Sequence, residues 1–371
     1  MECEHLASTL LLKASVKKTP FKELAKIAKV SPATVSRIAR GQANVDPEMR
    51  ARVRKAAADL GIDLEQQRHE RSSIIAFILG NRNILHSFQA RVLSGAENYC
   101  SSQHKEILFL SHRYPSTVPA RDLHLPQILN QRALVRAVIL GGTNSANMLE
   151  ALRAREIPFA VLGNNVVGPW TPDEYDAVYS DDVQGAYDLT LHLIEEGHRD
   201  IWFIGDTDLP WFARCAQGYR DRMTSAGLTP RFSEFHSDDR ELGYLAMRSI
   251  LSRREPVTAV MAGSDQIAAG VYEALSQAGL RIPEDICVAG FNDSEGSLMD
   301  PKLTSVREFP EELGKHLAEF VLRRIQDPGR EPQQLTIPTR VVVRESTRMR
   351  PSAGSAVPEF RRTETALPSE I

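Results

Sequence analysis

The 371-residue sequence lacks the features that mark secreted, disulfide-rich or membrane-spanning proteins. Its four cysteines are too widely spaced for a metal-ligand motif or a disulfide framework: Cys3, Cys100, Cys215 and Cys287. An apolar patch at Leu10-Leu11-Leu12 is too short to cross a bilayer, and Glu2 and Glu4 precede it where an export signal carries positive charge. These absences predict a cytoplasmic protein with reduced thiols and no membrane segment.

Motifs for phosphate binding or hydrolysis are also missing. The sequence has no Walker motif, no GxGxxG after a strand, no HExxH and no GxSxG. The acid pair Asp181-Asp182 would point to opposite faces of an extended strand, and His192 and His198 are expected to pack against or cap a helix end. We therefore predict no enzymatic activity, no cofactor and no metal site.

The stretch FKELAKIAKVSPATVSRIARG, from Phe21 to Gly41, predicts two short helices with a tight turn between them. Apolar residues recur at helical spacing in the first half: Phe21, Leu24, Ala25, Ile27 and Ala28. Ser31 can cap the second helix, and Pro32 suits its first position because no amide is needed there. Val35, Ile38 and Ala39 then face inward, which leaves an outer face of Ala33, Thr34, Ser36, Arg37 and Arg40.

Charge is distributed unevenly along the chain. Between Lys17 and Ala58 there are eleven basic and three acidic residues, a balance of +8, whereas the whole chain carries −3. A basic module on an acidic body is typical of proteins that bind a polyanion. The small hydroxyl-bearing outer face of the second helix would fit a DNA major groove. A solvated helical hairpin is the alternative.

A third helix follows, with Asp46 as its cap, Pro47 at its first position and Gly61 at its end. Its expected buried side consists of Met49, Val53, Ala56, Ala57 and Leu60. The polar segment DLEQQRHERSS from Asp63 to Ser73 then predicts a linker. Residues 1–18 are either a disordered leader or an over-long start, and residues 349–371 predict a disordered tail.

From Ile74 onward, apolar strand-like runs alternate with helical patterns, which predicts parallel sheets built from βαβ units. The runs are 74–79, 107–110, 137–140, 159–162, 177–179, 201–204, 259–261 and 286–289. Most end in small or polar residues, including Asn144 and Asn292. Ligands of open α/β proteins bind beyond the carboxyl ends of strands, so these residues are candidate ligand contacts, although strand ends are polar in every α/β protein. The number of strands favours two sheets that face one another across a cleft.

Several segments together resemble the lactose-repressor (LacI) family of transcriptional regulators over about Thr19 to Arg348. The matching pieces, in the family's order, are ELAKIAKVSPATVSRIARG, NVDPEMRARVRKAAADLG, YSDDVQGAYDLTLHLIEEGHRDIWFIG, GYRDRMTSAGL, PVTAVMAGSDQIAAGVYEALSQAGLRIPEDICVAGFND, LTSVREFPEELG and IPTRVVVRES. The resemblance implies a three-helix DNA-binding head on a two-lobed core like that of periplasmic sugar-binding proteins. It also implies a dimer that binds a near-palindromic operator.

The resemblance places Pro32, Ala33 and Arg37 at base-reading positions, with Ser31, Thr34 and Ser36 nearer phosphates. Because Pro32 and Ala33 have no side-chain donors, their readout would be apolar, and Arg37 would be the main polar reader. Arg40 stands where the family commonly has asparagine and is expected to contact a phosphate. The short linker lacks the alanine- and leucine-rich hinge helix of the family, so weak or absent bending of the operator is expected.

For the ligand, the resemblance points to Asp265, which follows Ser264 at the family's effector-contacting acid; capping of the helix Gln266 to Leu275 is the alternative. Phe88 matches the aromatic zone beside the ligand, with core packing as its alternative. The family's arginine position holds Cys215, with Arg214 one residue earlier, and Asp238 stands where relatives stack an aromatic ring. Trp211 and Phe212 could supply the missing aromatic surface. A carbohydrate is the expected ligand.

These observations predict an α/β fold in which a helix-turn-helix head, residues 19–62, is joined by linker 63–73 to a core of residues 74–348. The first lobe is expected at about 74–178 and 306–330, and the second at about 179–305 and 331–348. The expected function is a homodimeric, DNA-binding regulator, acting as a repressor, that responds to a small ligand. A cytoplasmic solute-sensing protein without operator control is the alternative.

Overall fold

The computed structural model describes residues 20–39, 45–60, 74–82, 86–237 and 239–347. The predicted leader, linker and C-terminal tail lie outside these residues. The chain is divided into two compact units. The first holds the described residues up to 75 together with 101–106 and 127–136, and the second holds the other described residues.

The N-terminal head consists of α2 (Pro20–Ile27), α3 (Pro32–Ala39) and α4 (Pro47–Asp59). The predicted caps are confirmed, because the Ser31 hydroxyl accepts from the Thr34 amide and the Asp46 carboxylate accepts from the amides of Glu48 and Met49. The three helices share one core: Leu24, Ala25, Ala28, Val35, Ile38, Val53, Ala56 and Ala57. The sequence therefore specifies a complete small module.

Three residues expected in this core are exposed instead. Ile27 is 50% exposed, Leu60 39% and Met49 38%. Each lies at the first or last turn of its helix, or just beyond it, where a short three-helix core cannot cover a side chain even at the correct helical spacing.

In the described residues, the core contains two six-stranded sheets and a two-stranded pair. The first sheet has the order β13-β7-β5-β3-β1-β2 and the second the order β14-β12-β11-β10-β8-β9. The first sheet comprises β1 (Ile74–Gly80), β2 (Glu106–His112), β3 (Val135–Gly142), β5 (Phe159–Leu162), β7 (Ala177–Ser180) and β13 (Gln334–Ile337). The second comprises β8 (Ile201–Ile204), β9 (Arg231–Phe232), β10 (Ala259–Ala262), β11 (Cys287–Asn292), β12 (Thr304–Arg307) and β14 (Arg340–Val342). The pair is β4 (Asn144–Ser145) with β6 (Val166–Val167).

All eight predicted strands are present. The predicted strands pair in parallel where they lie side by side as β10 with β11, β10 with β8, β3 with β5 and β5 with β7. The C-terminal strands were not predicted. Of these, β13 pairs in parallel with β7 of the first sheet, whereas β14 pairs antiparallel with β12 of the second. The expectation that all of residues 331–348 belong to the second lobe is therefore wrong, because Gln334–Ile337 completes the edge of the first sheet.

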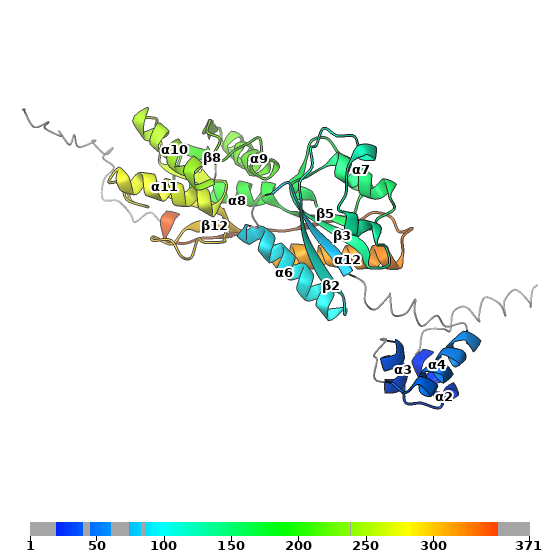
Figure 1. The fold of residues 1–371 in the computed structure, drawn as a ribbon. Coiled ribbons are helices and arrows are strands. Elements are labelled where there is room, and N and C mark those ends of the chain that lie inside the picture. The colour runs from blue at the N-terminus through cyan, green and yellow to red at the C-terminus, as the bar shows by residue number, and fades with distance from the viewer. Residues whose placement is uncertain (1–19, 40–44, 61–73, 83–85, 238, 348–371) are drawn as a thin grey trace, which may run out of the picture. The chain divides into compact units, whose positions relative to one another are not determined.

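Helices cover both sheets (Figure 1). They are α6 (Ser87–Ser102), α7 (Ala146–Ala154), α8 (Asp182–Glu195), α9 (Pro210–Ser225), α10 (Asp239–Ser252), α11 (Asp265–Gln277) and α12 (Pro310–Gln326). On the second sheet, alternate strand residues bury on opposite faces: Val260 packs with α10 and α11, whereas Met261 packs with α8 and α9. This period-two burial explains why the strands read as continuous apolar runs.

Glycines bring α10 and α11 into close contact, and Figure 1 shows these helices side by side. A Cβ atom at Gly243 would lie 2.0 Å from the Ile267 carbonyl oxygen, and one at Gly270 would lie 1.9 Å from that of Arg240. Any larger residue at either position would therefore push apart the two helices that begin beside the cavity described below.

The chain passes between the two sheets three times: from β7 to α8, from β12 to α12 and from β13 to β14. α12 packs against β5 and β7 of the first sheet. The crossings are tied together, because the Asp181 amide donates to the Ile337 carbonyl and the Thr339 hydroxyl donates to the Asp181 carbonyl. The sheets and their helices thus form two lobes joined by three short segments.

Candidate functional site

The head presents the predicted reading face. Pro32, Ala33 and Arg37 are exposed on α3, while Val35 and Ile38 on its other face are buried. The Ser31 hydroxyl caps the helix and also lies 2.9 Å from the Thr34 hydroxyl. The side chain of Ser36 and all of Arg40 lie outside what the structure describes. Contact of these residues with DNA stays a prediction.

A cavity of about 140 Å³ lies where strands of both sheets end. Its lining combines the end of the first lobe's strands with the beginnings of α9, α10 and α11. The polar and aromatic lining residues include Arg82, Phe88, Gln89, Asn164, Asp182, Trp211, Phe212, Asp239, Ser264, Gln266, Asn292, Ser294 and Glu308. Of the predicted contacts, Phe88, Trp211, Phe212 and Asn292 line the cavity. Asn144, Arg214 and Asp265 are not among its lining residues, and Asp238 lies outside the described residues.

The aromatic wall comes from the first turn of α9. The rings of Trp211 and Phe212 meet edge to face with centroids 5.8 Å apart. The guanidinium of Arg82, which follows β1, lies over the Trp211 ring at 4.2 Å and donates to the Thr143 hydroxyl at 3.3 Å. Burial lowers the pKa of Arg82, and the nearby Asp239 carboxylate opposes this effect. The cavity therefore offers an apolar face bordered by a cation.

Asn164 links the two lobes at the cavity. Its side chain accepts from the Ser180 amide at 2.7 Å and donates to the Asp182 carboxylate at 2.7 Å. The guanidinium of Arg214 donates to the same oxygen of Asp182 at 3.2 Å and also to the Asn164 carbonyl. Arg214, predicted to bind the ligand, thus serves as the ion-pair partner of a lining residue.

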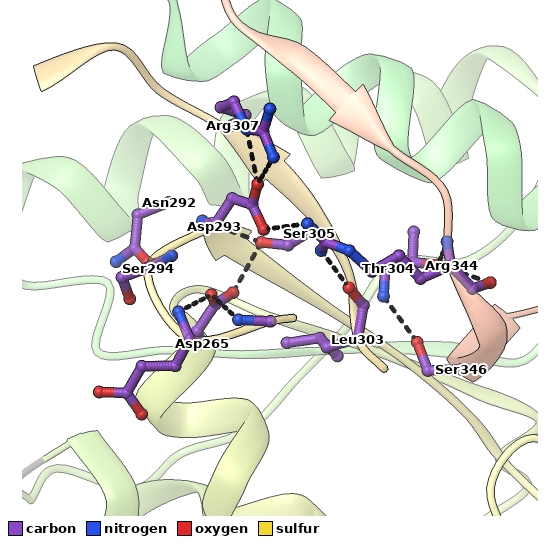
Figure 2. A network of polar contacts seen from close by, with 12 residues as sticks. Asp265, Asn292, Asp293, Ser294, Leu303, Thr304, Ser305, Arg307, Arg344 and Ser346 are labelled. Atoms are coloured by element: carbon purple, nitrogen blue, oxygen red, sulfur yellow. Dashed lines mark hydrogen bonds and ion pairs between the residues drawn. The ribbon is translucent and has the colours of Figure 1, made fainter. Parts of the chain in front are cut away.

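Asp265 has a role different from the predicted one. Its carboxylate accepts from the amides of Glu295 and Gly296 at 2.9 and 3.0 Å and from the Ser305 hydroxyl at 2.6 Å, as Figure 2 shows. The side chain is completely buried, and burial raises its pKa to about 6. Asp265 therefore fixes the loop after β11, so the prediction of ligand contact is not supported. The alternative that it caps α11 is also wrong, since the cap is Ser264, whose hydroxyl accepts from the Ile267 amide.

The fixed loop carries two lining residues, Asn292 and Ser294. Asn292 and Asp293 have φ angles of 81° and 47°, a left-handed conformation that costs energy for non-glycine residues. The Asp293 carboxylate is held by Arg307 at 2.6 Å and by Arg344 at 2.7 Å (Figure 2). These ion pairs, together with Asp265, keep the loop in the strained conformation that brings Asn292 to the cavity.

Asn144 is a second correction, because it is completely buried. Its side-chain oxygen accepts from the Tyr114 hydroxyl at 3.1 Å, and its amide nitrogen donates to the Gly141 carbonyl at 2.8 Å. Asn144 thus stabilises the turn after β3.

Asn164, Asp182 and Ser264 also line the cavity, and they lie in the polar segments after predicted strands that were expected to line a crevice. Several other lining residues were not predicted: Arg82, Gln89, Asp239, Gln266, Ser294 and Glu308. Glu308 had no such signal, because it lies on a crossing segment whose strand was not recognised. Cys215, also in the lining, is a buried thiol whose pKa burial raises well above its usual value.

In the described residues, one group of side chains lies close enough together to bind a metal ion. Ligand atoms of Asp206, Asp208 and His236 lie within 4.8 Å of one another. His236 and Asp208 are exposed, and the imidazole hydrogen-bonds to Asp206 at 2.9 Å, which accounts for the arrangement. Among the same residues, no helix is both long and apolar enough to cross a membrane.

Comparison with known proteins agrees with this architecture. Residues 21–62 match the family model of bacterial regulatory proteins, lacI family, and residues 190–347 match that of the periplasmic binding protein-like domain. The ribose operon repressor of Haemophilus influenzae is 28% identical over 337 residues, which cover 88% of this chain and 98% of the relative. The HTH-type transcriptional regulator CelR of Thermobifida fusca is 28% identical over 338 residues, 87% and 96% of the two chains.

Among solved structures, a transcriptional regulator CelR–cellobiose complex is similar with a TM-score of 0.64 and 26% identity, over 89% of this chain and all of the other. A lac repressor dimer bound to operator and an anti-inducer has a TM-score of 0.65 at 20% identity, over 89% and 99% of the two chains, which shows the fold alone. Together the matches establish the class, a helix-turn-helix transcriptional regulator. The chain contains a lacI-family DNA-binding domain and a periplasmic binding protein-like domain.

Proposed function

We propose that this regulator binds a near-palindromic operator as a homodimer and acts as a repressor in the bacterial cytoplasm, where the chromosome lies. The head, residues 19–62, would read only a few base pairs, so two heads are needed for specificity. Arg37 would contact a base edge, Pro32 and Ala33 a thymine methyl group, and Ser31 and Thr34 phosphates.

We further propose that a small carbohydrate in the cavity controls operator affinity. The observation that carries this proposal is the position of the cavity, whose lining comes from both lobes and from two of the three crossing segments. A ligand there would favour one arrangement of the lobes over another, and it can change operator affinity only through that difference. Aromatic rings beside amide and carboxylate groups suit a sugar, and two relatives are named for ribose and cellobiose.

The test uses the full chain. Operator DNA is selected from a random pool, its dissociation constant is measured by fluorescence anisotropy, and a set of sugars is screened by thermal shift. We expect binding to a two-half-site sequence and a sugar that raises the melting temperature. A core that binds sugar in a chain that selects no DNA would support the sensing alternative.

A further inference from the structure

The cavity has more carboxyl groups than cations to pair with them. Three carboxylates line it: Asp182, Asp239 and Glu308. Arg82 lies near Asp239, and Arg214 pairs with one oxygen of Asp182. The other Asp182 oxygen is buried and has no hydrogen-bond partner in the described part of the chain. Glu308, only 8% exposed, has no ion-pair partner within 4.0 Å among these residues.

The two cations that act on Glu308, Arg214 and Arg91, are already engaged. Arg91 on α6 forms two hydrogen bonds with Glu311, at 2.7 and 2.9 Å, and Arg214 is held by Asp182 and Asn164. An isolated buried carboxylate is costly unless a proton or an external cation neutralises it. Burial raises the pKa of both Glu308 and Asp182, which favours a proton on this pair when no external cation is bound.

We propose that the ligand carries a positively charged nitrogen, which Glu308 and the free oxygen of Asp182 bind at the cavity. Because the same cavity presents the Trp211 and Phe212 rings and the Gln266 and Asn292 amides, the chemical class that fits is an amino sugar with a free ammonium group. This inference rests on the proposed function in taking the cavity as the ligand site. An N-acetyl group would remove the charge and with it the recognised feature.

Binding of the ammonium group would release the proton of Glu308. The groups that act on this carboxyl are Asp182 at the start of α8, the Ser180 hydroxyl at the end of β7, Arg214 on α9 and Arg91 on α6. Of these, Asp182 opposes ionisation and the other three favour it. An incoming cation would outweigh the Asp182 repulsion and leave both carboxyls ionised.

The test is isothermal titration calorimetry of the full chain at pH 6 with glucosamine, galactosamine and mannosamine, each beside its neutral parent and its N-acetyl form. We expect at least one amino sugar to bind ten-fold or more tightly than both counterparts, with proton release detected as a difference in enthalpy between two buffers. Equal binding of a neutral parent, or no binding by any of the three amino sugars, would overturn the inference.

Variants test whether the Glu308 carboxyl causes the preference for amino sugars. Glu308→Gln should reduce the ratio of amino-sugar to neutral-sugar affinity to near one and abolish proton release, whereas Glu312→Gln, an exposed position on α12, should leave both unchanged. An unchanged ratio in Glu308→Gln contradicts the inference. If that variant does not fold, the ratio of amino-sugar to neutral-sugar affinity is measured in Asp182→Asn and compared with the wild-type ratio. If only a neutral sugar changed operator affinity, this inference would be refuted and the proposed function would stand. If an amino sugar bound without any effect on operator affinity, this inference would stand and the proposed control of DNA binding would be refuted.

Discussion

Arg82 of the first lobe lies over the ring of Trp211 in the second lobe, with its guanidinium carbon 4.2 Å from the ring centroid. The pair joins the segment after β1 to the first turn of α9, so it is a direct contact across the cavity. Any movement of the lobes that opened the cavity on this side would separate these side chains.

A double-mutant cycle measures this contact. Arg82→Ala and Trp211→Ala should each destabilise the chain, and the double variant should show a coupling of about 0.5–2 kcal/mol, as expected for a cation over an aromatic ring. The measurement is urea unfolding of the three variants and the wild type. Effects that add within about 0.3 kcal/mol would show that the contact carries no energy.

Asp265→Ala should destabilise the core by about 2–4 kcal/mol, because two loop amides and the Ser305 hydroxyl would lose a buried acceptor. Urea unfolding would detect the loss. Asp221→Ala is the control, since this exposed carboxylate accepts only a side-chain bond from Gln217 and should cost less than about 0.5 kcal/mol. Similar losses in the two variants would contradict the role of Asp265.

Glu308 should make stability depend on pH. Burial raises the pKa of this carboxyl to about 8, so the folded chain keeps a proton that the unfolded chain loses above its ordinary pKa of about 4.3. Stability is therefore expected to fall as pH rises between these values. In Glu308→Gln the fall from pH 5 to pH 8 should be smaller by about 1–3 kcal/mol, measured by urea unfolding at each pH.

The matched control for this pH series is Glu312→Gln, which makes the same substitution at an exposed position. It should keep the wild-type slope. A Glu308→Gln slope equal to that of the control would show that Glu308 is ionised in the folded chain at neutral pH.

Arg37→Ala should lose about 1–3 kcal/mol of discrimination at one base position of the operator. Arg37 is exposed on α3, whereas Arg52 is exposed on α4 and serves as the control. Competition binding on operator variants and random DNA would separate recognition of a base from electrostatic attraction to the DNA backbone. If Arg37→Ala weakened binding equally on every sequence, its role would be a phosphate contact.

The sequence was sufficient to predict the head and eight strands because each has a strong local signal, such as the Ser31 cap or a run of buried apolar residues. It was insufficient for β12, β13 and β14, which are short, and the last two of which are half-exposed at sheet edges. β13 and β14 also pair with strands far earlier in the chain, Gln334 with Ala177 and Val342 with Ser305, so local patterns could not place them.

The same distance effect explains the errors at the cavity. An acid at the start of α11 looks like a ligand contact until the loop of residues 293–296 is known to wrap around it. Asp182 and Glu308 come together only because two crossing segments meet, which no spacing along the sequence reveals. By contrast, Trp211 and Phe212 were found because the family resemblance implied an aromatic surface beside the ligand, which these two adjacent rings could supply.

The central claim is that a ligand in the cavity changes the affinity of the heads for DNA. The most direct measurement is the operator dissociation constant of the full chain, by anisotropy, without ligand and with a saturating amount of the sugar that calorimetry selects. We predict a change of at least about five-fold, and by thermodynamic linkage the sugar's own affinity must change by the same factor when operator is bound. Equal operator dissociation constants with and without the saturating sugar would contradict the account.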